Sequence, residues 1–137
     1  MKNLTLPATA VSLKCAAALA SLTFAAAGAM AQNYPSKPSR LVIPFAAGGG
    51  NDIVARVVAA RLGQGFGQPM VVENRPGANG FIAPRAVADA PPDGYTLLMG
   101  PTGPMSISPA IFSKMPYSPV KDFTPVTMIG SFPLILI

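Results

Sequence analysis

The sequence predicts an α/β fold in which helices flank an open, mostly parallel sheet. Short apolar runs rich in Val, Ile and Leu alternate with segments whose apolar residues recur at helical spacing. Gly, Pro and Asn cluster at the junctions between these segments, as is typical of turns. Such alternation favours parallel strands joined by right-handed crossovers, with ligands bound at the carboxyl ends of the strands.

An export signal precedes this predicted fold. Lys2 and Lys14 lead into an uncharged stretch rich in Ala and Leu, which ends in the small residues Ala29 and Ala31. This pattern is typical of a secretory signal peptide. We therefore expect residues 1–31 to be removed by cleavage after Ala31. The apolar core of the segment is shorter than the roughly 20 residues that span a bilayer, which disfavours a membrane anchor.

The rest of the chain lacks the residues that several catalytic and metal sites need. The whole sequence contains no histidine, and its single cysteine, Cys15, lies inside the expected signal peptide. Cys–His dyads, Ser–His–Asp triads and zinc sites built on Cys or His are therefore excluded. We expect no catalytic residue, no metal site and no cofactor.

The charge pattern favours a small anionic ligand over a nucleic acid. The net charge of the whole sequence is +5, and loss of Lys2 and Lys14 with the signal peptide lowers it to about +3. The remaining Lys and Arg residues are scattered singly and form no basic stripe with interleaved aromatic residues. A surface that binds nucleic acid would show such a stripe.

The first strand and helix are expected on either side of a glycine-rich loop. The run "RLVIPF", residues 40–45, predicts a buried strand, and residues 51–66 predict a helix. Asn51 or Asp52 is expected to cap this helix, and the glycines of residues 63–67 are expected to end it. The apolar face of the helix is expected to contain Ile53, Val54, Val57, Val58 and Leu62.

Two more strand and helix units are expected to follow. Residues 69–74 predict the second strand, and the turn "RPGANG" leads to a helix over residues 81–90. Pro84 fits that helix only if it lies in the first turn, where its missing N–H has no intrahelical partner. Residues 95–99 predict the third strand, and a short helix is expected after the "PTGP" loop.

The end of the sequence predicts further strands. Residues 126–130 are expected to form a fourth strand after a long connection that contains proline. The apolar run of residues 133–137 stops without a turn or a polar tail, and a bare terminal strand would expose its edge. We therefore interpret the chain as a fragment of a longer protein.

The glycine loop between the first strand and helix is the main candidate for a binding site. Glycine permits positive φ and close approach of a ligand, and the first N–H groups of the helix have no internal acceptor. A Walker loop and a dinucleotide fingerprint both fail, because Asn51 and Asp52 follow Gly50 and the third fingerprint glycine is Ile53. Asp52 would repel a phosphate dianion, which favours a carboxylate ligand.

A second loop is expected at the same edge of the sheet. Thr102 and Gly103 come just after the third strand, so that two loops can supply donors to one ligand carboxylate. A purely structural turn remains an alternative for each loop. The neighbouring Glu73, Asn74 and Arg75 could form an acid–base pair, but a structural turn with local ion pairing is favoured there.

Four ordered motifs carry a resemblance to a known family: "YPSKPSRLVIPFAAGGGNDIVAR", "VVENRPGANG", "PPDGYTLLMG" and "PVTMIGSFPLILI". With them the chain resembles the start of a Bug-family protein, the extracytoplasmic solute receptor of tripartite tricarboxylate transporters. The resemblance implies the first lobe of a two-lobed fold similar to type II periplasmic binding proteins. Residues 32–132 would be the N-terminal part of lobe 1, and residues 133–137 the start of the strand that crosses between lobes.

The resemblance also implies a function and a set of ligand-binding residues. Such a receptor is periplasmic, is monomeric when full length, and delivers a small carboxylate to membrane transporter subunits without chemistry. Its backbone amides around Gly48 to Asn51 would receive the carboxylate, in part through ordered water. The implied ligand-binding residues are Phe45, Ala46, Ala47, Gly48, Gly49, Gly50, Asn51 and Asp52 in the first loop, and Pro101, Thr102 and Gly103 in the second.

Two other functions stay open at this point. The first is an exported α/β hydrolytic enzyme with Asp52 or Glu73 as its general base. The second is a binding module that signals to a sensor kinase. Neither Glu73 nor Arg75 has a ligand role implied by the resemblance.

Overall fold

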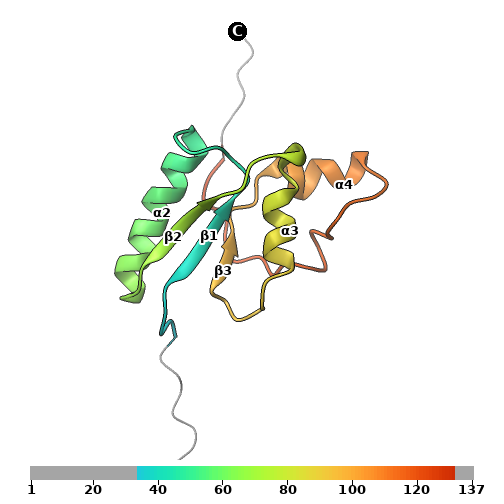
Figure 1. Cartoon of the computed structure of the whole chain (residues 1–137). Helices are drawn as coiled ribbons and strands as arrows, with labels where there is room; N and C mark the ends of the chain where they lie inside the picture. Colours follow the sequence, from blue (N-terminus) through green and yellow to red (C-terminus); the bar gives the residue numbers. More distant parts are fainter. Residues whose placement is uncertain (1–33, 132–137) are drawn as a thin grey trace, which may run out of the picture. The chain divides into compact units, whose positions relative to one another are not determined.

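The computed structural model describes residues 34–131, so the predicted signal peptide, its cleavage site and the predicted crossing strand over residues 133–137 lie outside the described residues. Three parallel strands form one sheet in the order β2-β1-β3 (Figure 1). The strands are β1 (Ser39–Ile43), β2 (Met70–Asn74) and β3 (Thr96–Leu98). The predicted parallel α/β architecture is confirmed in this part of the chain.

Helices cover the sheet on both sides. The helices are α2 (Gly50–Phe66), α3 (Ile82–Ala88) and α4 (Ser108–Ile111), with a 3-10 turn at Ala78–Gly80 and a π-helical turn at Gly103–Ile107. Helix α2 packs against β1 and β2, and α3 packs against β1 and β3 (Figure 1). Within residues 34–131, none of the helices has the length and apolar character needed to cross a membrane.

The core lies between β1 and α2. Leu41 and Ile43 alternate along β1 with Val42, so the two groups face opposite sides of the sheet. Leu41 and Ile43 pack against Ala55 and Ala59 of α2, and Ile43 is fully buried at 0% exposure. Burial of such a side chain stabilises the fold by roughly 1.5–3 kcal/mol.

The predicted apolar face of α2 is wrong in part. Ile53 and Val57 are each 59% exposed, whereas the buried residues of the helix are Asp52, Ala55 and Ala59. Small alanine side chains let the helix axis come close to the sheet, so the alanine face is buried and Ile53 and Val57 point away, while Val54, Val58 and Leu62 are half-buried. Hydrophobicity alone therefore misplaced Ile53 and Val57 among the five predicted residues.

The start of α2 differs from the prediction, whereas the end of α2 and the start of α3 agree with it. Gly49 is the N-cap of α2, and no side chain caps this helix, so the prediction of an Asn51 or Asp52 cap is wrong. The cause is that Asp52 binds the N–H of Gly48, which precedes the helix. Gly67 ends α2 in the left-handed conformation, and Pro84 lies in the first turn of α3, as predicted.

The predicted fourth strand over residues 126–130 is wrong. This segment contains no strand, and the sheet within residues 34–131 consists of β1, β2 and β3. Val126 and Met128 are 83% and 81% exposed. A β-strand is stabilised by hydrogen bonds to a neighbouring strand, and the described residues provide none for this segment.

Candidate ligand-binding site

The strand order creates a crevice at the carboxyl edge of the sheet. Strand β1 lies between β2 and β3. After β1 the chain runs to α2, and after β3 it runs to α4, which lies on the side of α3 in Figure 1. Connections that diverge from neighbouring strands leave a crevice outside the strand ends, where α/β proteins bind ligands. The two predicted loops border this crevice.

A pocket of about 290 Å³ occupies this crevice, close to the lower limit for small-molecule sites. The structure brings together Phe45 from the first predicted loop with Pro101 and Gly103 from the second. The complete lining is Pro44, Phe45, Asn79, Gly80, Pro101, Gly103 and Pro104. The other predicted ligand residues do not line it: Ala46, Ala47, Gly48, Gly49, Gly50, Asn51, Asp52 and Thr102.

Sequence reasoning missed the contribution of the turn after β2. Gly80 has φ +83°, and a Cβ at this position would lie 2.7 Å from Cγ of Pro104 and 3.7 Å from Cβ of Pro44. Only glycine therefore fits between these two prolines at the pocket. The signal was present in the sequence, since the turn after the second parallel strand must lie at the same edge as the other two loops, but its composition of Pro, Gly and Asn favours a purely structural turn.

The glycine loop presents backbone donors on the surface. Gly48 has φ +85°, which favours glycine, and the loop from Ala46 to Gly50 is exposed. Gly50 and Asn51 are the first residues of α2, so their N–H groups have no intrahelical acceptor, and the helix dipole adds positive character there. This arrangement can hold an anion without a cationic side chain.

A buried carboxylate lies beneath the loop. The side chain of Asp52, with the residue only 3% exposed, accepts hydrogen bonds from the Gly48 N–H at 2.9 Å and from Arg56 Nε at 2.9 Å. Asn74 Nδ2 donates to its other oxygen at 2.9 Å, and also to the carbonyl of Phe45 at 3.0 Å. The Arg56 hydrogen bond, followed by those from Gly48 and Asn74, holds the pKa of Asp52 well below its usual range.

The two candidate general bases are both engaged. Asp52 stays ionised and both of its oxygens accept hydrogen bonds, while its hydrogen bond to Arg56 and its charge raise the pKa of Arg56. Glu73 pairs with Arg75 Nε at 2.6 Å and with Arg40 Nη1 at 3.3 Å, which confirms the predicted local ion pairing. Both oxygens of each carboxylate already accept hydrogen bonds or pair with Arg, so neither is held free for a substrate proton as a general base would be.

The second loop is supported from below by an aromatic cluster. Tyr117 is 6% exposed, and its hydroxyl donates to the carbonyl of Pro104 at 2.8 Å. Its ring meets Phe81 and Phe123 edge to face, with ring centroids 5.9 and 5.8 Å apart. Burial raises the pKa of Tyr117, so the phenol stays a neutral donor.

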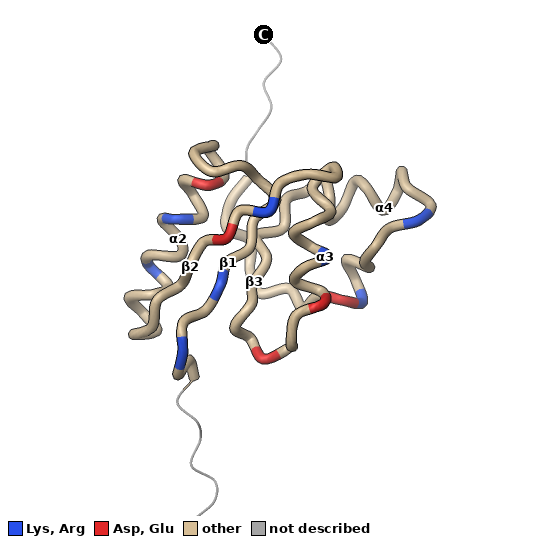
Figure 2. Tube along the Cα trace, viewed as in Figure 1, with Lys and Arg blue, Asp and Glu red and all other residues tan. Residues whose placement is uncertain are grey.

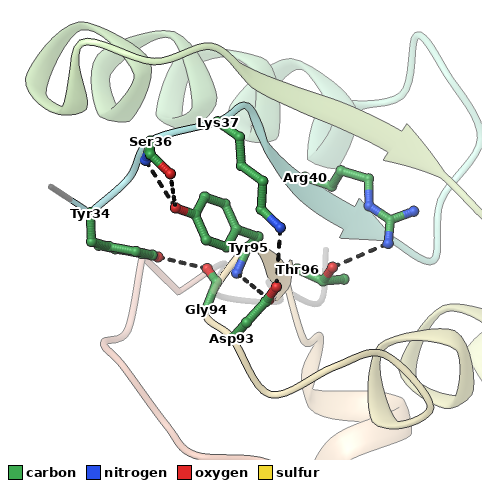
Figure 3. A network of polar contacts seen from close by, with 8 residues as sticks. All are labelled: Tyr34, Ser36, Lys37, Arg40, Asp93, Gly94, Tyr95 and Thr96. Atoms are coloured by element: carbon green, nitrogen blue, oxygen red, sulfur yellow. Dashed lines mark hydrogen bonds and ion pairs between the residues drawn. The ribbon is translucent and has the colours of Figure 1, made fainter. Parts of the chain in front are cut away.

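The opposite edge of the sheet carries a different polar network (Figure 3). The Tyr34 hydroxyl donates to the carbonyl of Gly94 at 2.7 Å, and the Ser36 N–H donates to the Tyr95 hydroxyl at 2.9 Å. Lys37 Nζ lies 3.3 Å from the carboxylate of Asp93 and 4.3 Å from the centroid of the Tyr95 ring. These contacts join the segment before β1 to the turn before β3.

A larger hollow of about 420 Å³ also lies at this opposite edge, between the last turns of α2 and the start of β2. Its lining consists of Ala, Gly, Gln, Pro and Met residues and contains no charged side chain. Ligands of parallel α/β sheets bind at the carboxyl edge, so the smaller crevice is the better candidate despite its size.

No charged side chain lines the pocket at the carboxyl edge, and the charged residues near the two edges form ion pairs and no patch of one sign. Figure 2 shows Lys and Arg spread singly over the strands and helices, with Asp and Glu interspersed. Within residues 34–131, no three His, Cys, Asp or Glu side chains are grouped in a way that could hold a metal ion. Anion binding at the crevice would therefore depend on backbone donors.

Comparison with known proteins identifies similar chains. Protein BugT of Bordetella pertussis is 41% identical over 113 residues, which are 82% of this chain and 35% of BugT. A solved periplasmic transporter is 52% identical with a TM-score of 0.66, over 69% of this chain and 32% of that one. MatC from Rhodopseudomonas palustris, solved with bound malate, is 45% identical with a TM-score of 0.65, over 68% of this chain and 32% of MatC.

These matches fix both the extent and the kind of the similarity. The chain spans about a third of the length of the relatives that it matches. The family model of the tripartite tricarboxylate transporter family receptor matches residues 54–137, which is more than half of the chain. The chain therefore belongs to the tripartite tricarboxylate transporter receptor family.

Proposed function

We propose that this chain is the N-terminal part of the first lobe of a periplasmic solute receptor, which captures a small carboxylate for a tripartite tricarboxylate-type transporter. Residues 1–31 are its signal peptide, cleaved near Ala31, and residues 133–137 begin the strand that crosses to the second lobe. The full-length receptor is a monomer that binds without chemistry. Closure of its two lobes around the ligand favours the state that membrane transporter subunits recognise.

The observation that carries this proposal is the convergence of two loops at the carboxyl edge of the sheet. Phe45, Pro101 and Gly103 line one pocket, and the exposed glycine loop beside it presents backbone N–H groups. A small carboxylate is the ligand class that suits neutral backbone donors, a modest volume and a nearby helix N-terminus. Malate, which is bound in the solved structure of the similar protein MatC, belongs to this class of ligand.

Eight of the eleven predicted ligand residues have a proposed part in this site. The amides of Gly49, Gly50 and Asn51 receive the carboxylate, in part through ordered water. The Gly48 N–H is directed to Asp52, so Gly48 serves the loop conformation instead. Phe45, Pro101 and Gly103 shape the pocket, and the exposed Thr102 supplies a hydroxyl at its rim.

A thermal-shift titration of the full-length gene product with malate tests the proposal. A ligand that binds only the folded state stabilises it by mass action, by about 2.7 kcal/mol at a concentration of 100 times Kd. We expect malate or another small dicarboxylate to raise the melting temperature in this way, and an uncharged analogue such as the diamide to leave it unchanged.

The opposite result has a clear form. If no small mono-, di- or tricarboxylate at millimolar concentration stabilises the full-length protein, the ligand class is wrong. If the protein hydrolyses a carboxylate ester and Asp52→Asn abolishes this activity, the protein is an enzyme and the receptor function is wrong.

A further inference from the structure

The exposed glycine loop is not held in place by packing from outside. Residues Ala46 to Gly50 are all exposed, and a Cβ built on Gly48 or Gly50 would meet no atom within 4 Å. Such a loop has few contacts to restrict it and would sample many conformations if nothing else fixed it. Its order must come from the side chains that lie beneath it.

The carboxylate of Asp52 collects donors from three separate segments. They are the N–H of Gly48 in the loop, Nε of Arg56 one turn further along α2, and Nδ2 of Asn74 at the end of β2. A carboxylate that is only 3% exposed is stable only when its lone pairs are satisfied in this way. The loop, the helix and the sheet therefore meet at one side chain.

Asn74 extends this arrangement to the first residue of the loop. Its Nδ2 also donates to the carbonyl of Phe45 at 3.0 Å, while its Oδ1 accepts from Arg56 Nη2 at 3.3 Å. Asn74 is the last residue of β2 and pairs with Ile43 in the register of the sheet. The start, the middle and the end of the loop are thus tied to a strand by Asn74 and Asp52.

We infer that Asp52 is a positioning residue that, together with Asn74, holds the glycine loop in the conformation that presents the amides of Gly49 to Asn51 to a ligand carboxylate. The inference deepens the proposed function and rests on it for the identity of the ligand. In this role Asp52 acts through the loop and not by contact with the ligand, because it is only 3% exposed and three donors already surround its carboxylate. Arg56 compensates the negative charge beneath the site.

The positioning role predicts that Asp52→Asn lowers the affinity for the ligand, whereas a simple charge effect predicts that it raises the affinity. A carboxylate close to an anion site repels the ligand, so its neutralisation by Asp52→Asn would tighten binding if charge were all that mattered. As a positioning residue, Asp52 must accept three donors, and an asparagine amide turns one acceptor into a donor that faces other donors. The same substitution then loosens the loop and weakens binding.

The test uses the full-length gene product and four variants. They are Asp52→Asn, Asn74→Ala, the double variant, and Asp93→Asn as a matched control. Asp93 also accepts a backbone N–H, from Tyr95 at 3.0 Å, and also pairs with a cation, Lys37, but at the opposite edge of the sheet. The readouts are the amide order parameters of residues 46–51 without ligand and the calorimetric affinity for malate.

We expect both single variants to lower the order parameters of the loop from about 0.85 to below about 0.6, while the amides of β1 keep their values. The Kd for malate rises by about tenfold or more in each. The double variant is no worse than the single ones, because the two residues act as one unit. Asp93→Asn changes neither readout. If Asp52→Asn fails to fold, Asn74→Ala alone carries the test.

Two results would overturn the inference: an unchanged loop order in Asp52→Asn and Asn74→Ala, or an affinity for malate that equals or exceeds that of the wild type. Failure of the proposed function looks different, because then the wild type binds no carboxylate at all. The order parameters still decide the inference in that case, since a loosened loop in the variants supports the positioning role of Asp52 and Asn74, and a rigid loop contradicts it.

Discussion

The two edges of the sheet use polar groups in opposite ways. At the carboxyl edge, Asp52 and Asn74 point inward and bond to the loop, so the backbone N–H groups of the loop remain on the surface. At the opposite, amino edge, exposed side chains join two segments: Tyr34 bonds to the carbonyl of Gly94, and Lys37 pairs with Asp93 (Figure 3). Side chains that are buried under a loop can shape a binding surface, whereas exposed ones only join chain segments.

The difference also appears in what each edge leaves available. The carboxyl edge combines a pocket lined by Phe45 and Pro101 with glycine backbone that a ligand can approach closely. At the amino edge, Ser36, Lys37, Asp93 and Tyr95 are paired with one another, and the hollow near this edge lacks charged side chains. A comparison of matched substitutions at the two edges therefore separates binding from stability.

The largest effect is expected from the core that supports both edges. Ile43→Ala removes a fully buried side chain and should cost about 2–5 kcal/mol of unfolding free energy. Urea unfolding measures the change, and Val57→Ala on the exposed face of α2 is the control. Equal losses in both variants would contradict the core assigned to β1 and α2.

Glycine substitutions give the sharpest contrast between the edges. Gly80 has φ +83° and a Cβ would lie 2.7 Å from Pro104, while Gly94 has φ +80° and a Cβ would lie 2.8 Å from Tyr34. Gly80→Ala and Gly94→Ala should each cost roughly 1–3 kcal/mol in stability, by backbone strain and overpacking. The affinity for malate should fall only in Gly80→Ala. A similar loss of affinity in both variants would contradict the assignment of ligand binding to the carboxyl edge alone.

A smaller effect is expected beneath the second loop. Tyr117→Phe removes the hydrogen bond to the Pro104 carbonyl and keeps the edge-to-face contacts of the ring. The loss should be about 1 kcal/mol of unfolding free energy, the usual net value of such a bond. Chemical denaturation at neutral pH gives the number. An unchanged stability would mean that water replaces the phenol at this carbonyl.

The smallest effect is expected at the exposed amino edge. Lys37→Gln removes an ion pair whose side chains are 59% and 41% exposed, and solvent screens such pairs strongly. Its effect on stability should be smaller than that of Tyr117→Phe and should vanish in high salt. Thermal unfolding at low and high ionic strength tests this. A large loss that persists in salt would show that this edge holds the fold more firmly than its exposure indicates.

Local patterns were enough to predict most of the fold. The strands around Leu41, Val72 and Leu97 are short apolar runs between turn residues, and Pro84 could be placed because its chemistry permits only the first helical turn. The apolar face of α2 failed because packing distance, and not hydrophobicity, chose Ala55 and Ala59. Residues 126–130 failed because a strand depends on a partner that the segment itself does not contain.

The site was harder to predict because its geometry depends on distant residues. The glycine loop and "PTGP" carry local signals, and Phe45, Pro101 and Gly103 do meet in one pocket. The contacts of Asn74 with Asp52 and Phe45 join residues that are 22 and 29 positions apart, and no local pattern marks them. The part of Gly80 likewise emerges only when Pro104 is placed against it.

The position of Asn74 at the last rung of the ladder between β1 and β2 has a consequence for local unfolding. Surface loops normally exchange their amide hydrogens with solvent through small, independent openings. Here the N–H of Gly48 is bonded to Asp52, which is bonded in turn to the end of a strand. We therefore expect the Gly48 amide to exchange more slowly than the exposure of the loop alone would indicate, because its release requires Asp52 to separate from the loop.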